Sequence, residues 1–301
     1  MKVLVSGSSG LIGTALCDSL AADGHTVARL RRPGGAAQAA DVRWDPANGQ
    51  IDAAAMEGVD AVVNLSGASI GEGRWTEARK KILRSSRVDA TRLLVEALAR
   101  LGQRPRVFIS SSASGFYGHR GDELLTESSA PGDDFIARLA RDWEAEAARA
   151  QALGIRTTFA RFGVVLAPQG GALRRMMPPF RLGLGGRLGS GKQWMPWIAL
   201  EDAIAALRFA LVTETLSGPI NFVAPGSVAN AEFTRVLARV LHRPAIFPAP
   251  AFALRLALGE MAEALLLASQ HVIPEKLSRS GFTFRYGELE AALRAVLERQ
   301  R

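Results

Sequence analysis

Cysteine, histidine and tyrosine are scarce in this chain of 301 residues, and each shortage excludes a class of protein or site. Cys17 is the one cysteine, so no disulfide can form within the chain, and we expect a reducing, cytoplasmic compartment. The four histidines are scattered without the spacing of metal ligands, so we expect no metal site. No apolar run is long enough to span a bilayer, and glycines interrupt the first apolar stretch too early for a signal peptide. We therefore expect no membrane partner.

The first fourteen residues hold the motif around which the chain is organised. Residues 2–6 predict a short buried strand, a glycine turn follows at once, and a helix pattern begins at Leu11. A strand, a glycine turn and a helix N-terminus in this order form a cradle for a pyrophosphate. Gly7 permits the tight turn, Gly10 lets the phosphates approach the backbone, and Gly13 lets the helix pack close to the strand. The motif predicts that the chain binds a dinucleotide.

The end of the second predicted strand, residues 26–30, bears on the choice of dinucleotide. In an NAD enzyme, an acidic residue at this place binds the ribose 2′-hydroxyl. This chain has Arg31 and Arg32 instead, and an arginine fork can pair with a 2′-phosphate. The sequence therefore favours NADP(H), with two solvated surface arginines as the alternative. Asp45, at the end of the third predicted strand, either lies beside the adenine or begins a plain turn.

Positive charge exceeds negative charge, with 37 Lys and Arg against 29 Asp and Glu, and the formal net charge is +8. An excess of this kind can indicate a nucleic-acid or membrane partner. The arginines are spread along the chain, however, and no basic block or nucleic-acid-binding motif is present. We therefore expect no nucleic-acid partner, because an anionic cofactor and an anionic small-molecule substrate can account for the charge.

Strands and helices alternate along the first two thirds of the chain. Apolar runs at 60–66, 106–111 and 155–161 predict three further strands, and helix patterns separate them. Connections of this length are typical of a parallel, doubly wound sheet. We expect an α/β fold of the Rossmann type over residues 1–225, followed by a smaller, mainly helical C-terminal lobe over residues 245–299.

The sequence also predicts the structure of two further segments and the start of one helix. Residues 167–196 are rich in Gly, Arg, Met and Pro, and they predict a long irregular loop that acts as a lid over the cofactor crevice. Its basic residues either meet an anionic substrate or are ordinary exposed charges. Residues 251–268 predict one strongly apolar helix that belongs to the core or to a dimer face, so a monomer and a homodimer both stay open. Asp133 or Asp134 can cap the helix that follows the fifth strand.

Several motifs point together to a known superfamily. They are the glycine triplet at 7–13, Asn-Leu-Ser-Gly-Ala at 64–68, Ser-Ser-Ser-Ala-Ser-Gly-Phe-Tyr-Gly at 110–118 and Arg-Phe-Gly at 161–163. With them the chain resembles the extended short-chain dehydrogenase/reductases, which include the nucleotide-sugar epimerases and dehydratases. It more closely resembles an atypical, epimerase-like subgroup of unsettled substrate that has a characteristic C-terminal domain. The closer match is carried by Trp-Asp-Pro at 44–46, Gly-Lys-Gln-Trp at 191–194, Pro-Trp-Ile at 196–198 and the piece at 273–286.

The resemblance also implies a catalytic pair that this chain lacks. The superfamily uses Tyr-x-x-x-Lys, in which the phenol is the acid/base group and the lysine lowers its pKa from about 10. Neither Tyr117 nor Tyr286 is followed by a lysine four residues later. Alignment on the Trp-Glu pair at 143–144 puts Ile136 and Ala140 at the two positions. The standard proton-transfer groups are therefore missing.

Two functions remain open at this point. One is an NADP-dependent oxidoreductase or epimerase-like enzyme that acts on an unknown small molecule with altered acid/base groups. In this hypothesis Ser112 matches the family's catalytic serine, and Tyr117 either supplies the proton or only shapes its loop. The other is a non-catalytic NADP(H)-binding protein that reports redox state to a protein partner through its C-terminal helices. The motifs and the resemblance predict these cofactor contacts: Gly7, Ser9, Gly10, Leu11, Ile12, Gly13, Arg31, Arg32, Asp45, Leu65, Ser66, Gly67, Ala68, Ser110, Arg161, Phe162 and Gly163.

Overall fold

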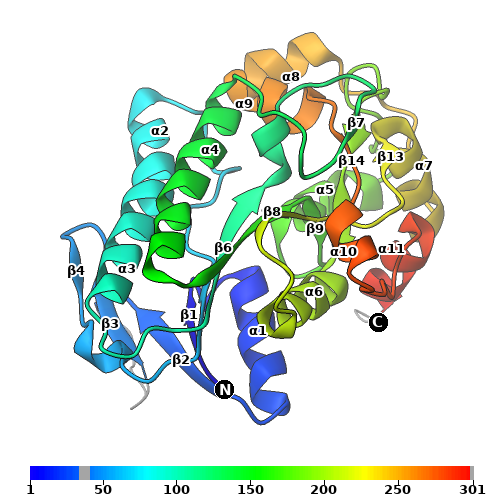
Figure 1. The fold of residues 1–301 in the computed structure, drawn as a ribbon. Helices are drawn as coiled ribbons and strands as arrows, with labels where there is room; N and C mark the ends of the chain where they lie inside the picture. The colour runs from blue at the N-terminus through cyan, green and yellow to red at the C-terminus, as the bar shows by residue number, and fades with distance from the viewer. Residues whose placement is uncertain (34–40, 299–301) are drawn as a thin grey trace.

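The computed structural model describes residues 1–33 and 41–298, and an eight-stranded sheet lies at its centre (Figure 1). In spatial order its strands are β12 (Gly218–Phe222), β8 (Arg156–Phe162), β6 (Val107–Ala113), β5 (Ala61–Asn64), β1 (Lys2–Ser6), β2 (Thr26–Arg31), β3 (Val42–Asp45) and β4 (Gln50–Ile51). Every neighbouring pair is parallel except β3 with β4. The chain therefore winds outward from β1 in both directions, which confirms the predicted doubly wound, Rossmann-type α/β fold.

Helices cover both faces of the sheet (Figure 1). The covering helices are α1 (Leu11–Ala22) and α6 (Leu200–Val212) on one face, and α2 (Glu77–Arg84), α3 (Ala90–Ala99) and α4 (Phe135–Ala148) on the other. Side chains of β1 alternate between the two faces, so Val3 and Val5 join the core under α1 and α6, whereas Leu4 joins the core under α3. Burial on both faces explains why the central strands are continuous runs of apolar residues.

Two of these helical segments end at glycines with positive φ, a conformation that favours glycine. Gly24 follows α1 with a φ of +79°, and Gly154 follows the helical segment after α4 with a φ of +78°. Of the two candidate caps for α4, the structure selects Asp134, whose carboxylate accepts a hydrogen bond of 2.8 Å from the Ala137 amide.

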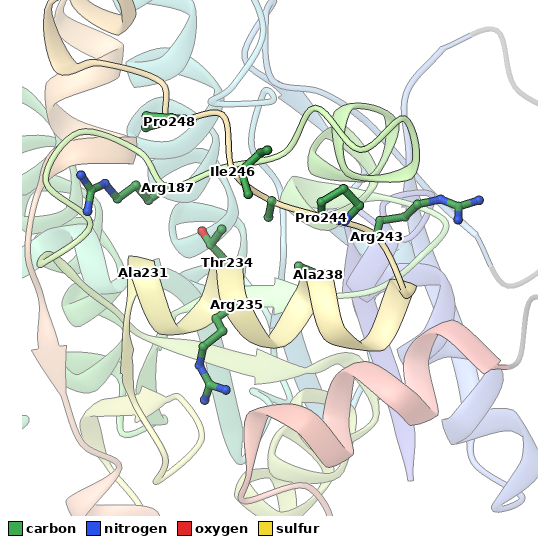
Figure 2. A pocket seen from close by; sticks show the side chains of 10 residues that line it. Arg187, Ala231, Thr234, Arg235, Ala238, Arg243, Pro244, Ile246 and Pro248 are labelled. Carbon is green, nitrogen blue, oxygen red and sulfur yellow. The ribbon is translucent and has the colours of Figure 1, made fainter.

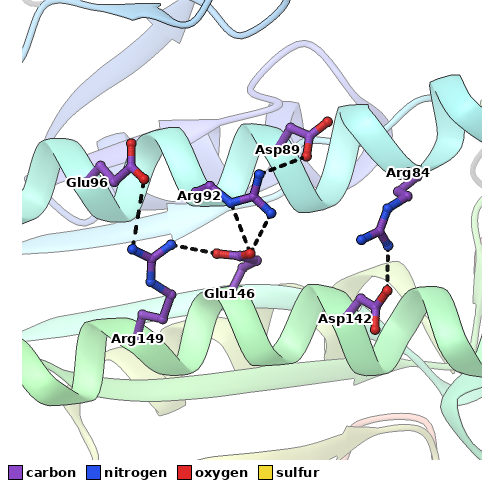
Figure 3. A network of polar contacts seen from close by, with 7 residues as sticks. All are labelled: Arg84, Asp89, Arg92, Glu96, Asp142, Glu146 and Arg149. Atoms are coloured by element: carbon purple, nitrogen blue, oxygen red, sulfur yellow. Dashed lines mark hydrogen bonds and ion pairs between the residues drawn. The ribbon is translucent and has the colours of Figure 1, made fainter.

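A π turn, Ser85–Asp89, joins α2 and α3 into one helical run. This run packs beside α4, and a network of ion pairs at the surface joins the two (Figure 3). Across the contact Arg84 pairs with Asp142, Arg92 with Glu146 and Arg149 with Glu96, while Arg92 with Asp89 and Arg149 with Glu146 are pairs within one segment. Pairs this exposed are each worth at most about 1 kcal/mol.

The prediction of an irregular loop over residues 167–196 was wrong for residues 171–181, whereas residues 182–193 form neither helix nor strand, and the role of the segment as a lid stays a prediction. The segment contains α5 (Gly171–Arg181), whose Leu173, Met177 and Phe180 are buried at helical spacing. Two prolines lie inside this helix, and their helix-breaking tendency had favoured a loop. Burial of one apolar face against the rest of the lobe outweighs that local cost.

The prediction of one helix over residues 251–268 was also wrong. Gly259 adopts a φ of +63°, and no α-helix can continue through that conformation. The segment is therefore divided into α8 (Ala251–Leu258), α9 (Glu260–Ala262) and a π turn, Glu263–Leu267.

A smaller lobe is built around its own apolar core beside the sheet. Its main helices are α5, α7 (Asn230–Leu241) and α11 (Leu289–Glu298), with β11 (Trp197–Ala199) beneath them. The remaining elements are β7 (Leu124–Leu125), β9 (Val164–Leu166), β10 (Trp194–Met195), β13 (Val228–Ala229), β14 (His271–Val272), α10 (Glu275–Arg279) and the short helical turns Ala54–Met56, Ser114–Tyr117 and Arg149–Leu153. Within residues 1–33 and 41–298, no helix combines the length and the apolar character needed to cross a membrane.

Candidate cofactor-binding crevice

The glycine turn between β1 and α1 lies where the winding of the sheet reverses, at the carboxyl ends of β1 and β5. A Cβ on Gly7 would stand 2.5 Å from the Leu65 carbonyl oxygen, and one on Gly13 would stand 2.2 Å from that of Gly7. The packing of the protein itself therefore requires these two glycines. A Cβ on the exposed Gly10 would meet a single atom, the Gly7 oxygen at 3.2 Å, so the protein leaves the space above Gly10 open.

Gly10 also begins α1 without any side-chain cap. The amides of the first helical turn are therefore left for an anion, as in other helix N-termini that bind phosphate. Of the neighbouring predicted contacts, Ser9 is exposed, and Leu11 and Ile12 are half-buried at the start of the helix. The structure thus brings this part of the predicted site together at one open helix end.

The loop after β5 forms the wall next to this cradle. The Leu65 amide donates to the Ser6 hydroxyl at 3.1 Å, and this bond ties the loop to the end of β1. Ser66 is buried, whereas Gly67 is exposed. The Ala68 amide donates to the Ser86 hydroxyl, so Ala68 has only its side chain and its exposed surface left for a cofactor.

The two arginines that favour NADP(H) lie at the end of β2. The Arg31 Nε atom lies 3.3 Å from the Asp41 Oδ2 atom in an ion pair, and the Arg31 side chain is 32% exposed. Arg32 is exposed. Both are therefore accessible to a ligand beside β2, and their contact with a 2′-phosphate stays a prediction.

Asp45 accepts hydrogen bonds from the amides of Ala47 and Asn48 and from the Asn48 side chain. This geometry supports the turn alternative for Asp45, and its contact with an adenine stays a prediction.

The predicted catalytic residues lie in a buried polar network. The Ser112 hydroxyl donates to Glu144 at 2.6 Å, and Arg161 binds both oxygens of that carboxylate at 2.8 and 2.7 Å. Arg161 also donates to the Tyr117 hydroxyl at 3.0 Å, which in turn donates to Asn221 at 2.6 Å. These side chains are nearly inaccessible to solvent. The network links β6, α4, β8 and β12 inside the molecule.

This burial bears directly on the proposed chemistry of Tyr117. The residue has no exposed surface, and burial raises the pKa of its phenol, although the charge of Arg161 works against this. The phenol is therefore protonated at neutral pH, but its proton is already shared with Asn221. The Ser112 hydroxyl likewise already donates its hydrogen bond to Glu144. Catalytic roles for both residues stay predictions, and each role requires the residue to exchange an internal partner for a substrate.

The other predicted contacts around β6 and β8 also face inward. Ser110 is buried beside Asn64, and the Arg161 guanidinium stacks 3.5 Å from the centre of the Phe116 ring. Phe162 packs against another phenylalanine of the core. A Cβ on Gly163 would stand 2.6 Å from the carbonyl oxygen of residue 196, so close backbone packing explains this glycine.

Apolar side chains occupy the two positions that the alignment assigns to the superfamily's tyrosine and lysine, and this assignment stays a prediction. Ile136 and Ala140 are 5% and 3% exposed, and Ile136 packs with Trp75 and Met261. A Cβ on Gly115 would stand 2.4 Å from the Ile136 side chain, so the glycine makes room for the isoleucine. No acid/base group is present at this place.

Glu144, the centre of the buried network, is not among the site residues predicted from the sequence. The available signal was a charged residue on the face of α4 that also carries Ile136, Ala140 and Ala147. An acidic residue on an apolar helix face requires a buried partner, and Arg161 is that partner.

A cavity of about 500 Å³ lies away from this crevice, between α7 and residues 243–248 (Figure 2). None of the predicted cofactor contacts lines it. Its floor includes Thr234 and alanines of α7, and Pro244 and Ile246 lie opposite.

Comparison with known proteins decides the family. The model of the NAD dependent epimerase/dehydratase family matches residues 3–223, and that of the domain of unknown function DUF1731 matches residues 249–296. The chain belongs to the NAD-dependent epimerase/dehydratase family. This confirms the resemblance carried by the motifs and by the C-terminal piece.

Similar proteins span nearly the whole chain. The epimerase family protein Mb2239 of Mycobacterium bovis is 45% identical over 97% of this chain and 96% of its own length. The epimerase family protein YfhF of Bacillus subtilis is 38% identical over 99% of this chain and 98% of its own. The crystal structure of human epimerase family protein SDR39U1 with NADPH superposes with a TM-score of 0.90 at 37% identity, covering 99% of both chains.

Proposed function

We propose that the protein binds NADP(H) in the crevice above β1 and β5 and that it is an oxidoreductase or epimerase-like enzyme with altered acid/base groups. One observation carries the cofactor site. Gly10 is the glycine of the triplet that the packing of the protein does not require, and it leaves an uncapped helix end open to a pyrophosphate. Arginines at the end of β2, where NAD enzymes have an acidic residue, support NADP(H) over NAD(H). The NADPH in the structure of the similar human protein supports the same choice.

The wild-type protein is expected to bind NADPH more tightly than NADH. Arg31→Ala should weaken NADPH binding by about 1.5–3 kcal/mol, the worth of a hydrogen bond to a charged group, and should leave NADH binding unchanged. Fluorescence titration with both cofactors measures this. Arg104→Ala is the matched control, because Arg104 lies before β6 and binds the carbonyl of residue 153. Equal or tighter binding of NADH by the wild type would contradict the proposed preference.

Because the Tyr-x-x-x-Lys pair is missing, we expect slow turnover of ordinary substrates. General acid–base catalysis contributes about 10²- to 10⁴-fold, so reduction of generic aldehydes, ketones and nucleotide sugars should be weak even with NADPH saturating. On a true substrate, Ser112→Ala and Tyr117→Phe should each lower turnover about tenfold or more without changing NADPH affinity. Fast turnover that survives both substitutions would remove these two residues from the mechanism.

A non-catalytic NADP(H) sensor is the second candidate function. Filling of the acid/base positions by Ile136 and Ala140, together with the burial of Tyr117, favours it. Tight NADPH binding with no turnover on any carbonyl substrate, and a protein partner whose binding to the C-terminal helices changes with the redox state of the cofactor, would support the sensor over the enzyme.

A further inference from the structure

The loop of residues 68–71, which follows β5 in the crevice, is held in an unusual way. Each of its four consecutive carbonyl oxygens accepts a hydrogen bond from a side chain. In the order of the carbonyls, the donors are Arg87, Arg79, Trp75 and Arg175. Three arginines from different elements therefore converge on one short loop.

The amides of this loop are used differently from its carbonyls. Ala68 donates its amide proton to Ser86, but the amides of Ser69, Ile70 and Gly71 have no hydrogen-bond partner in the described part of the chain. Three of the four carbonyls are held by arginines, and the amides of residues 69–71 remain as donors for another group. Successive backbone amides of this kind can bind an anion.

Positive charge around the loop is poorly neutralised. Arg87 and Arg175 form no ion pair within 4.0 Å among the described residues, and Arg79 has only the exposed Glu72 at 3.6 Å. Burial lowers the pKa of Arg87 to about 10, and the charge of Arg79 adds to this effect. Arg79 and Arg87 repel each other, so an anion beside them would be stabilised.

The loop lies beside the proposed cofactor site. Helix α5, which carries Arg175, begins next to the cradle, because a Cβ on Gly170 would stand 3.2 Å from the Leu11 side chain. At the other side α5 reaches Gly71 through Arg175. Arg175 therefore connects the loop to the helix that begins at the cradle. Ala68 and Ile70 pack on the apolar cluster around Ile136, which offers a molecule bound at the loop an apolar neighbour.

We propose that loop 68–71, with Arg79, Arg87 and Arg175, is a subsite for a phosphate or carboxylate group of the substrate, beside NADP(H). The inference rests on the proposed function, because it places the substrate next to that cofactor. It names the substrate class as a small anionic molecule whose charged group is held by arginine forks and backbone amides. Arg175 is the best probe of the three arginines, because it is exposed on α5 and its replacement leaves the core intact.

Inorganic pyrophosphate titrated into the NADPH-saturated protein in a calorimeter tests the subsite. NADPH occupies the glycine cradle in this experiment, so the added anion must bind elsewhere. The wild type is expected to bind pyrophosphate, and Arg175→Gln should weaken that binding about tenfold or more, as for the loss of a hydrogen bond to a charged group. Arg174→Gln is the matched control. It removes the same charge from the adjacent position of α5, where the side chain binds the Gln169 carbonyl and, among the described residues, no carbonyl of loop 68–71.

Three outcomes would overturn the subsite. The first is absence of pyrophosphate binding to the NADPH-saturated wild type, and the second is an equal loss in Arg174→Gln. The third is a loss of NADPH affinity in Arg175→Gln without any second anion site, since the arginine would then serve the cofactor. Failure of the wild type to bind NADPH would instead contradict the proposed function. In that case, pyrophosphate binding that still depends on Arg175 would support the anion subsite by itself.

Discussion

Gly10→Val is expected to abolish NADPH binding while leaving the fold largely intact. An added Cβ at this exposed position would stand 3.2 Å from the Gly7 carbonyl oxygen, so the turn has to shift by a few tenths of an ångström, and the backbone φ of −79° is one that side chains adopt readily. A branched side chain would instead fill the space that the pyrophosphate needs above the end of α1. Loss of two charged hydrogen bonds corresponds to about 3–6 kcal/mol, or more than about a hundredfold in affinity. Fluorescence titration and circular dichroism measure binding and folding.

Substitutions at two further glycines distinguish a loss of cofactor binding at the cradle from a general effect of replacing a glycine. Gly102→Val is the matched control, since Gly102 is exposed at the opposite edge of the sheet and an added Cβ would meet only Glu57 at 3.7 Å. It should bind NADPH normally. Gly13→Ala should destabilise the fold itself, because its Cβ would stand 2.2 Å from the Gly7 oxygen. Normal NADPH affinity in a folded Gly10→Val protein would refute the cradle assignment.

Arg161→Met is expected to lower the free energy of unfolding by about 3–5 kcal/mol, the cost of leaving a buried charge without its partner. Arg161 is 3% exposed and supplies two of the three side-chain hydrogen bonds that Glu144 accepts. Its loss leaves the buried carboxylate with the Ser112 hydroxyl alone and removes a hydrogen-bond donor from Tyr117. Urea denaturation followed by circular dichroism measures the change.

The control for this substitution is Arg149→Met, in the exposed network of Figure 3. The Arg149 side chain is 50% exposed, so its removal should cost less than about 1 kcal/mol. The double variant Arg161→Met with Glu144→Leu should recover part of the lost stability, because no uncompensated charge then remains. A loss below about 1 kcal/mol in Arg161→Met alone would show that the pair does not hold the interior together.

The cradle and the parallel sheet could be predicted because their signals are local. β1, the glycine turn and α1 are consecutive in the chain, and residue type alone specifies the positive φ of Gly7 and Gly24. The apolar runs that became β5, β6 and β8 also lie between clear helix patterns. Such features depend on neighbours a few residues apart, which the sequence displays directly.

The direction of the polar side chains around β6 could not be predicted in this way. Arg161 meets Glu144 across 17 residues and Tyr117 across 44, and Tyr117 meets Asn221 across 104. Whether each of them faces the crevice or the interior depends on which strands become neighbours. The motifs therefore singled out Tyr117 and Arg161 without showing that they bind Asn221 and Glu144 inside the molecule.

The sequence by itself determined a strand, glycine turn and helix in the order of a dinucleotide cradle, a doubly wound sheet and the absence of the usual Tyr-x-x-x-Lys pair. Only the tertiary structure decided that residues 171–181 are helical, that Tyr117 is enclosed, and that three arginines gather on loop 68–71. The physical reason is the same in each case. Local propensity is a weak term, and the packing of side chains that are distant in the chain outweighs it once the sheet brings them together.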